Sequence, residues 1–170
     1  MPGTIAKNRD LIALPPSGGR HYAMGKLSAV FKADEDETGS GYSISEWIIE
    51  PGQQGVGAHH HDENDEVFYV LEGEPDVLTG ETWGTYAPGS FLRIPAGMTH
   101  DFRNNGDQPA KLLNVFIPGG FERSMPGIVK WFEDNPDQAR ALRAARASSL
   151  RTRSGGVASL ASASTTSSRV

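Results

Sequence analysis

Two short stretches of the chain contain side chains whose types and spacing suit the binding of a metal ion. The first reads H-x-H-x4-E-x6-G from His59 to Gly73, and the second reads G-x5-P-x-G-x2-H-x3-N from Gly89 to Asn104. Four of the five histidines lie within these stretches. Imidazole nitrogens combined with a carboxylate suit a divalent transition metal. The candidate ligands are therefore His59, His61, Glu66 and His100.

The first stretch has the spacing of a β-strand that presents two ligands on one face. Residues two apart on a strand point to the same side, so His59 and His61 would lie side by side while His60 points away. A turn over residues 62–65 would reverse the chain and return Glu66 to the same place from the neighbouring antiparallel strand. Three ligands would then converge from one hairpin.

His100 would approach the same point from a second direction. It follows the turn Pro95-Ala96-Gly97 and opens the short strand HDFRN, so a rigid turn would aim its side chain. The alternative for three adjacent histidines is a solvated loop, and a lone histidine after a turn is usually structural. The loop interpretation fits His60, but the apolar strand that begins directly after Glu66 disfavours it for the proposed ligands.

Composition restricts both the fold and the ligand chemistry. A chain of 170 residues fits one domain, and 20 glycines with 11 prolines indicate a turn-rich protein that leans toward β structure. Cysteine is absent, which excludes disulfides, thiolate ligands and a cysteine nucleophile. Any metal must therefore be held by nitrogen and oxygen.

Charge and hydropathy disfavour two classes of partner. Residues 139–170 carry six arginines and no acid, so the first 138 residues hold all 21 acids against 10 bases. Such an acidic domain would repel nucleic acid. The first twenty residues lack the apolar region of a secretory signal, and no window approaches the roughly 18 apolar residues of a membrane span. We expect a cytoplasmic protein with no membrane partner.

Short strand-like segments recur between turns over residues 25–125 and predict an all-β sandwich or barrel. We expect an N-terminal arm over 1–24, an edge strand near 26–32, a solvated acidic loop at 34–37 and a strand over 42–50. The further segments of strand length are HHH, EVFYVLEG, PDVLTG, TWGTYA, SFLRIP, THDFRN and AKLLNVFIP.

The last part of the chain differs in character. Residues 126–147 have helical spacings, such as Ile128, Trp131 and Phe132, and predict two short helices. From residue 148 to 170 the chain is rich in Ser and Ala, with too little apolar surface to offset the entropy of ordering, so we expect disorder. The arginines at 140, 143 and 146 would line one helix face and could contact an acidic partner, although a solvated terminal helix is the simpler interpretation.

The two stretches together resemble the signature motifs of the cupin superfamily, which are small antiparallel β-barrels of jelly-roll topology. The second motif matches at Gly89, Pro95, Gly97, His100 and Asn104, and the first matches at His59, His61, Glu66 and Gly73. The leading glycine of the first motif lies one residue early, at Gly52, or late, at Gly55. The resemblance covers about residues 25–120, and the flanks are similar to small single-domain bacterial-type cupins described as quercetin dioxygenase-like. It implies a cupin jelly-roll β-barrel with short C-terminal helices and a disordered tail.

The resemblance also implies a function. A centre of three imidazoles and one carboxylate leaves positions open for further ligands, which favours a metal-dependent, dioxygenase-like oxidoreductase acting on a small organic substrate, either aromatic or a diketone. Glu66 would be a ligand or, if it swings away, a general base. Iron, manganese, nickel, copper, cobalt and zinc all remain open. The alternatives are a non-catalytic metal or small-ligand binding cupin, a cupin cyclase or isomerase, and a structural cupin, which the complete ligand set disfavours.

The substrate pocket and the assembly are the remaining expectations. Same-face positions on the strands place Phe68, Val70 and Phe102 at the pocket, with barrel packing as the alternative for each. The strand residues whose orientation the sequence leaves undecided are Tyr42, Glu46 and Asn114. Small cupins of this kind are commonly dimers, and the segment 1–30 could cover exposed sheet edges, so we expect a homodimer.

Overall fold

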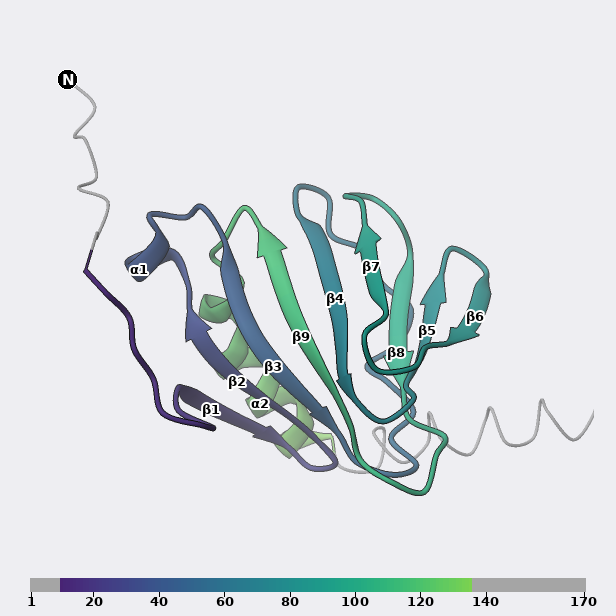
Figure 1. The fold of residues 1–170 in the computed structure, drawn as a ribbon. Coiled ribbons are helices and arrows are strands. Elements are labelled where there is room, and N and C mark those ends of the chain that lie inside the picture. The colour runs from purple at the N-terminus through teal and green to yellow at the C-terminus, as the bar shows by residue number, and fades with distance from the viewer. Residues whose placement is uncertain (1–9, 136–170) are drawn as a thin grey trace, which may run out of the picture. The chain divides into compact units, whose positions relative to one another are not determined.

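The computed structural model describes residues 10–135, which fold mainly as two antiparallel sheets (Figure 1). The larger sheet has six strands in the order β1-β2-β3-β9-β4-β7. Its strands are β1 (Arg20–Met24), β2 (Leu27–Ala33), β3 (Ser43–Ile49), β4 (Asp65–Glu72), β7 (Phe91–Ile94) and β9 (Ala110–Ile117). The smaller sheet, in the order β6-β5-β8, contains β5 (Asp76–Thr79), β6 (Thr82–Thr85) and β8 (His100–Arg103).

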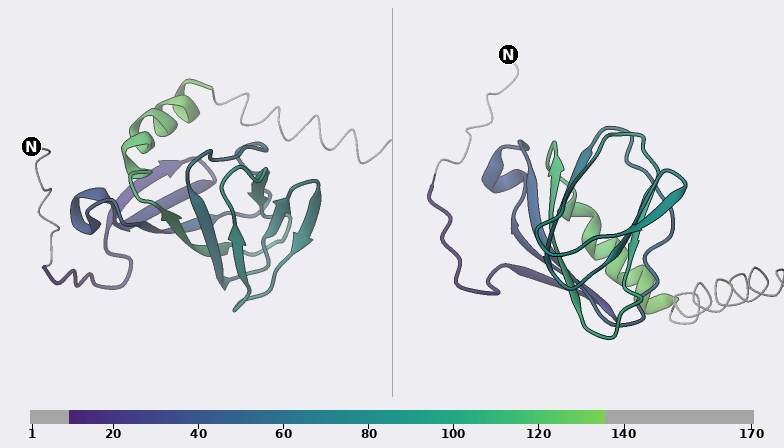
Figure 2. Two further views of the ribbon diagram at one scale, coloured as in Figure 1. Left: turned by 90° about the horizontal axis from the view of Figure 1, so that it is seen from above. Right: turned by 45° about the vertical axis from the view of Figure 1, so that its right-hand side comes forward.

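Three helical segments accompany the sheets. A single turn, α1 (Glu35–Thr38), joins β2 to β3, and the 3-10 turn η1 (Glu122–Ser124) leads directly into the helix α2 (Met125–Asp134). The views in Figure 2 show α2 beside β1 and β2. No helix among residues 10–135 is long and apolar enough to cross a membrane.

Strict alternation of side chains builds the core of this fold. In β3, the side chains of Ser43, Ser45, Trp47 and Ile49 are buried while the intervening residues are partly exposed, which is the period of two expected for a strand. The largest fully buried apolar side chains are Phe31, Phe68, Phe116, Leu27, Ile49, Ile94, Leu112 and Met125. The core thus lies on the inner faces of the sheets, and Met125 joins α2 to it.

This architecture confirms the predicted all-β jelly-roll fold, with local differences at its N-terminal end. The strand expected near 26–32 is β2, but it is not an edge strand, because β1 pairs with it from Arg20 to Met24. Residues 20–24, assigned from sequence to the arm, therefore belong to the larger sheet. At the other end, α2 is one of the two expected helices; the rest of the 126–147 segment and the predicted tail over 148–170 lie outside the described residues.

The acidic segment 34–37 is not the solvated loop that its charge predicts. Asp34 is buried and precedes α1, where its carboxylate accepts hydrogen bonds from the Ser43 hydroxyl and from the backbone N–H groups of Gly120 (2.5 Å) and Glu122 (2.7 Å). Donors of this kind offset the cost of removing a carboxylate from water. They come from segments distant along the chain, so the charge pattern of 34–37 could not indicate them.

Candidate metal centre

The histidine segment is held against β8. The backbone N–H of His59 donates to the His100 carbonyl (3.0 Å), the N–H of His100 donates to the His59 carbonyl (2.8 Å), and the N–H of Gly97 donates to the His61 carbonyl (2.8 Å). The loop that precedes the histidines also lies close to β8. A Cβ atom at Gly55 (φ +87°) would lie 2.5 Å from the Phe102 carbonyl oxygen, so this approach requires glycine. A glycine-dependent approach of the loop to β8 therefore places His59 beside His100.

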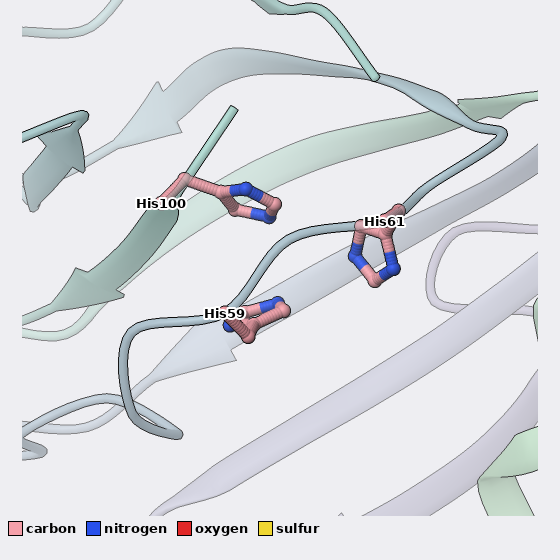
Figure 3. A group of neighbouring side chains, drawn as sticks. All are labelled: His59, His61 and His100. Carbon is pink, nitrogen blue, oxygen red and sulfur yellow. The ribbon is translucent and has the colours of Figure 1, made fainter. Parts of the chain in front are cut away.

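Three imidazoles converge at this point (Figure 3). One ring nitrogen from each of His59, His61 and His100 lies within 4.8 Å of the others. The Nδ1 atoms of His59 and His100 lie 2.8 Å and 2.9 Å from the carbonyls of Gly57 and Met98. Donation from Nδ1–H to those carbonyls leaves the Nε2 lone pairs of His59 and His100 available to a metal.

Glu66, at the start of β4, completes the predicted set. Its carboxylate oxygen Oε2 lies 2.6 Å from Nε2 of His100 and 3.5 Å from Nε2 of His61. The other oxygen, Oε1, accepts a hydrogen bond of 2.5 Å from the side-chain amide of Asn114, a fully buried residue of β9. Asn114 thus fixes the carboxylate so that Oε2 faces the imidazoles.

Electrostatics in this cluster favour a charged carboxylate. Burial by itself would raise the pKa of Glu66, but the imidazoles of His100 and His61 outweigh it and lower that pKa to about 2. Burial would likewise lower the pKa of His100, yet the adjacent Glu66 carboxylate raises it. Burial lowers the pKa of His59, which keeps its imidazole neutral and suited to ligation. The cluster therefore combines one anionic oxygen with imidazole nitrogen.

The described residues fit a divalent transition metal. Nε2 of His61, Oε2 of Glu66 and Nε2 of His100 are buried, and none of them makes a hydrogen bond of acceptable geometry. Buried polar atoms normally have partners, and a bound metal ion would be a partner for these three atoms. The ring nitrogens of His59, His61 and His100 form one group, and the Glu66 carboxylate contacts two of them, those of His61 and His100. His60 projects elsewhere, where its Nε2 lies 3.2 Å from the exposed Asp62 carboxylate.

A cavity of about 320 Å³ adjoins His59, His61 and Glu66. Phe102 lies on its wall, but Phe68 and Val70 do not; both are buried in the core. They occupy the same strand face as Glu66, but farther along β4, where the Phe68 ring packs edge-on against Phe102 with centroids 5.8 Å apart. The alternation of side chains along a strand correctly predicts which face these residues occupy. It does not indicate where along the strand the cavity ends.

The remaining wall residues are apolar, and all of them lie outside the two motifs. They are Met24, Trp47, Val56, Phe116, Phe121, Ile128, Trp131 and Phe132. The helical spacing of the last three is visible in the sequence, but it gives them no role in a site. Of the three strand residues whose orientation the sequence leaves undecided, Asn114 contacts Glu66, and none of Asn114, Tyr42 and Glu46 lines this cavity.

Fold and site together correspond to a known family. Residues 45–116 match the family model described as a cupin domain, which identifies the barrel as one of the cupin superfamily. A solved structure, TT1209 from Thermus thermophilus, is 29% identical with a TM-score of 0.54, covering 64% of this chain and 98% of that one.

Two curated relatives are similar over part of this chain. Polyketide synthase CurC from Streptomyces cyaneus is 38% identical over 72 residues, which is 42% of this chain and 46% of that protein. Quercetin 2,3-dioxygenase from Bacillus subtilis (strain 168) is 34% identical over 61 residues, which is 36% of this chain and 18% of that protein. This chain thus spans less than half the length of either relative.

Proposed function

We propose that the protein binds one divalent transition metal through His59, His61, Glu66 and His100 and acts as a metal-dependent oxygenase on a small aromatic or diketone substrate. The observation that carries this proposal is the position of the ligand cluster, with its unpartnered buried atoms, at the wall of an apolar cavity. Iron, manganese, nickel, copper, cobalt and zinc are all compatible with this donor set.

The cavity wall favours this substrate class over sugars and small organic acids. Within residues 10–135, no lysine or arginine lines it, and the indole N–H of Trp47 is occupied by the Ser45 hydroxyl at 3.0 Å. Hydrogen-bonding side chains are thus concentrated at the ligand cluster. A substrate that fits this wall carries its oxygen atoms at one end and hydrocarbon or aromatic surface elsewhere.

The bound metal and the chain's own residues would make different contributions to the chemistry. A bound divalent metal would supply Lewis acidity and positions open to a further ligand. The apolar wall would exclude water and orient the substrate, and Glu66 would accept a proton from an enol or hydroxyl group if its carboxylate swung away from the metal. Asn114 would hold Glu66 in the orientation in which Oε2 faces the imidazoles.

A cyclase or isomerase is the second candidate, because the relative from Streptomyces cyaneus is named a polyketide synthase. The relative named quercetin 2,3-dioxygenase supports the oxygenase. Both candidates use the same metal and the same cavity, and they differ in whether dioxygen is consumed. Non-catalytic binding of a small ligand is the third possibility.

Oxygen consumption with product mass separates these candidates. Protein loaded in turn with each of the six metals is incubated with a panel of flavonols and 1,3-diketones, with metal-free protein as the control. Dioxygenation consumes O2 and adds two oxygen atoms to the products, whereas isomerisation or cyclisation leaves O2 untouched. Absence of O2 consumption for every metal and substrate would overturn the oxygenase proposal.

A further inference from the structure

One side of the cavity is built by α2, which lies beyond the residues that match the cupin domain. That match ends at residue 116, whereas α2 spans Met125–Asp134. Ile128, Trp131 and Phe132 have the spacing of one helix face and all line the cavity. On the opposite face, Lys130 and Asp134 form an exposed ion pair at 2.7 Å. The helix therefore presents an apolar, largely aromatic face to the cavity.

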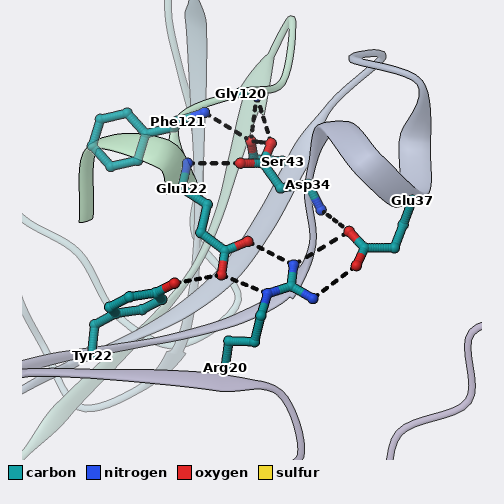
Figure 4. Close-up of polar contacts among 8 residues, drawn as sticks. All are labelled: Arg20, Tyr22, Asp34, Glu37, Ser43, Gly120, Phe121 and Glu122. Atoms are coloured by element: carbon teal, nitrogen blue, oxygen red, sulfur yellow. Dashed lines mark hydrogen bonds and ion pairs between the residues drawn. The ribbon is translucent and has the colours of Figure 1, made fainter. Parts of the chain in front are cut away.

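The start of this wall is fixed firmly to the barrel (Figure 4). The Glu122 carboxylate accepts hydrogen bonds from the Arg20 guanidinium (2.6 Å) and from the Tyr22 hydroxyl (2.9 Å), both on β1. The Glu122 N–H donates to the buried Asp34 carboxylate at 2.7 Å. Directly afterwards, Met125 is fully buried in the core. The helix thus leaves the barrel in a defined direction, which gives its inner face a defined position.

The aromatic surface of the wall continues to the ligand cluster. The Phe121 ring stacks on Phe116 with centroids 4.0 Å apart, and both rings meet the His61 imidazole edge-on, at 5.6 Å and 5.1 Å. At the other end of the wall, the Trp131 and Phe132 rings meet edge-on at 5.3 Å. Trp131 is 43% exposed, more than a core aromatic residue would be, which places it where the cavity meets solvent.

We propose that this α2 face is a second subsite, which binds an aromatic ring of the ligand separately from the oxygen atoms held at the metal centre. The ligand class is a compound with two oxygen donors at one end and an aryl group at the other. The subsite rests on the proposed function, because the metal centre must hold the oxygen end. Trp131 and Phe132 determine the preference for the ring, since aromatic pairs gain from stacked or edge-to-face geometry beyond simple burial.

Two diketones that differ by one ring test the subsite directly. 1-Phenyl-1,3-butanedione and 2,4-pentanedione share the chelating group, and only the first has an aryl ring. We expect zinc-loaded protein to bind the phenyl compound about 10-fold or more tightly than the ringless compound, as measured by calorimetry. The Trp131→Ala and Phe132→Ala variants should lose most of that preference while retaining their affinity for zinc and for 2,4-pentanedione. Lys130→Ala, on the opposite face of α2, should leave the preference unchanged.

The outcomes separate the subsite from the function on which it rests. A preference for the phenyl compound that survives in both aromatic variants overturns the subsite, and so does equal binding of the two diketones by the wild-type protein. Failure of zinc-loaded wild-type protein to bind either diketone overturns the proposed function. Circular dichroism and zinc stoichiometry are measured for each variant, and Trp131→Leu is added as a milder change. These controls distinguish loss of the ring from displacement of the helix.

Discussion

His61 is the proposed ligand most enclosed by aromatic rings, and it provides a clean test of the metal centre. Replacing it with alanine removes one nitrogen donor and leaves the barrel strands intact. We expect His61→Ala to lose stoichiometric binding of divalent metal, measured by elemental analysis and by titration with cobalt or nickel. The variant should remain folded by circular dichroism, because His61 lies outside the strands that build the barrel.

His60 supplies the matched control for this experiment. It is adjacent in sequence and identical in chemistry, but its imidazole is 53% exposed and lies beside Asp62. His60→Ala should therefore bind metal as the wild-type protein does. A His61→Ala protein that still holds one equivalent of metal would contradict the ligand assignment.

Asn114 is expected to tune the centre without touching the metal. Its amide fixes Glu66 Oε1 at 2.5 Å, so Asn114→Ala leaves that oxygen without its donor and frees the carboxylate to rotate. Loss of a partner of this type costs metal affinity about 10-fold to 100-fold, which a competition titration with a chromogenic chelator would measure. Asn64→Ala, which removes an exposed amide that donates to the Pro118 carbonyl, is the control. An unchanged dissociation constant in Asn114→Ala would refute the tuning role.

At the scale of single residues, the sequence indicates the proposed ligands but not the residues that support them. The four proposed ligands could be named because their types and spacing suit metal binding. Asn114 could not, because one polar residue in the apolar run AKLLNVFIP gives no information about which partner it meets across the sheet. Phe68 and Val70 show the same limit, since alternation defines a face and not the depth of a cavity.

At the scale of elements, the histidine segment pairs with a different strand from the one its hairpin pattern suggested. The predicted partner was the strand containing Glu66, but β4 lies between β7 and β9, and His59 bridges to His100 at the start of β8. Successive segments of a jelly roll often pass between sheets instead of pairing with each other. The ligands converge nevertheless, because the two sheets face each other across the core.

The smaller sheet depends on one acidic side chain that joins its three strands. Asp76 on β5 accepts hydrogen bonds from Thr85 at the end of β6 (2.6 Å), from Arg103 at the end of β8 (2.9 Å) and from Asn105 (2.6 Å). Burial would raise the pKa of Asp76, but these donors outweigh it and hold the pKa below its ordinary value. The folded state therefore favours the ionised carboxylate.

The direction of this pKa shift predicts how stability depends on pH. A depressed folded pKa contributes stability above the unfolded value of about 3.9, and this contribution is lost as the pH falls through the folded pKa. We expect Asp76→Asn to lower the free energy of unfolding by about 1 kcal/mol at pH 7, with the difference from wild type shrinking below about pH 4. Urea unfolding at several pH values measures it. The exposed Asp107→Asn is the control, and a pH-independent difference for Asp76→Asn would contradict this account.

At the scale of the whole molecule, the larger sheet is apolar on both faces. The outward residues of β3, β9, β4 and β7 include Ile44, Ile48, Val67, Tyr69, Leu113, Val115, Ile117 and Phe91, of which Phe91 is 65% exposed. Antiparallel sheets that face water usually carry polar residues at such positions. The charged residues beside this face are paired internally, Arg93 with Asp65 at 2.5 Å and Lys111 with Glu72 at 3.0 Å.

This outer face bears on the expected homodimer, which stays a prediction. The sequence predicted a dimer contact at sheet edges covered by the N-terminal arm. The structure offers a different surface, an apolar face whose charged side chains are paired within the same chain. A second copy of this face can pack against it without like-charge repulsion. We expect the wild-type protein to sediment as a dimer at micromolar concentration and Phe91→Glu to sediment as a monomer, since each dimer would bury two unpaired carboxylates. Phe91→Leu keeps the face apolar and should remain dimeric. A wild-type mass equal to one chain across this concentration range would exclude the dimer.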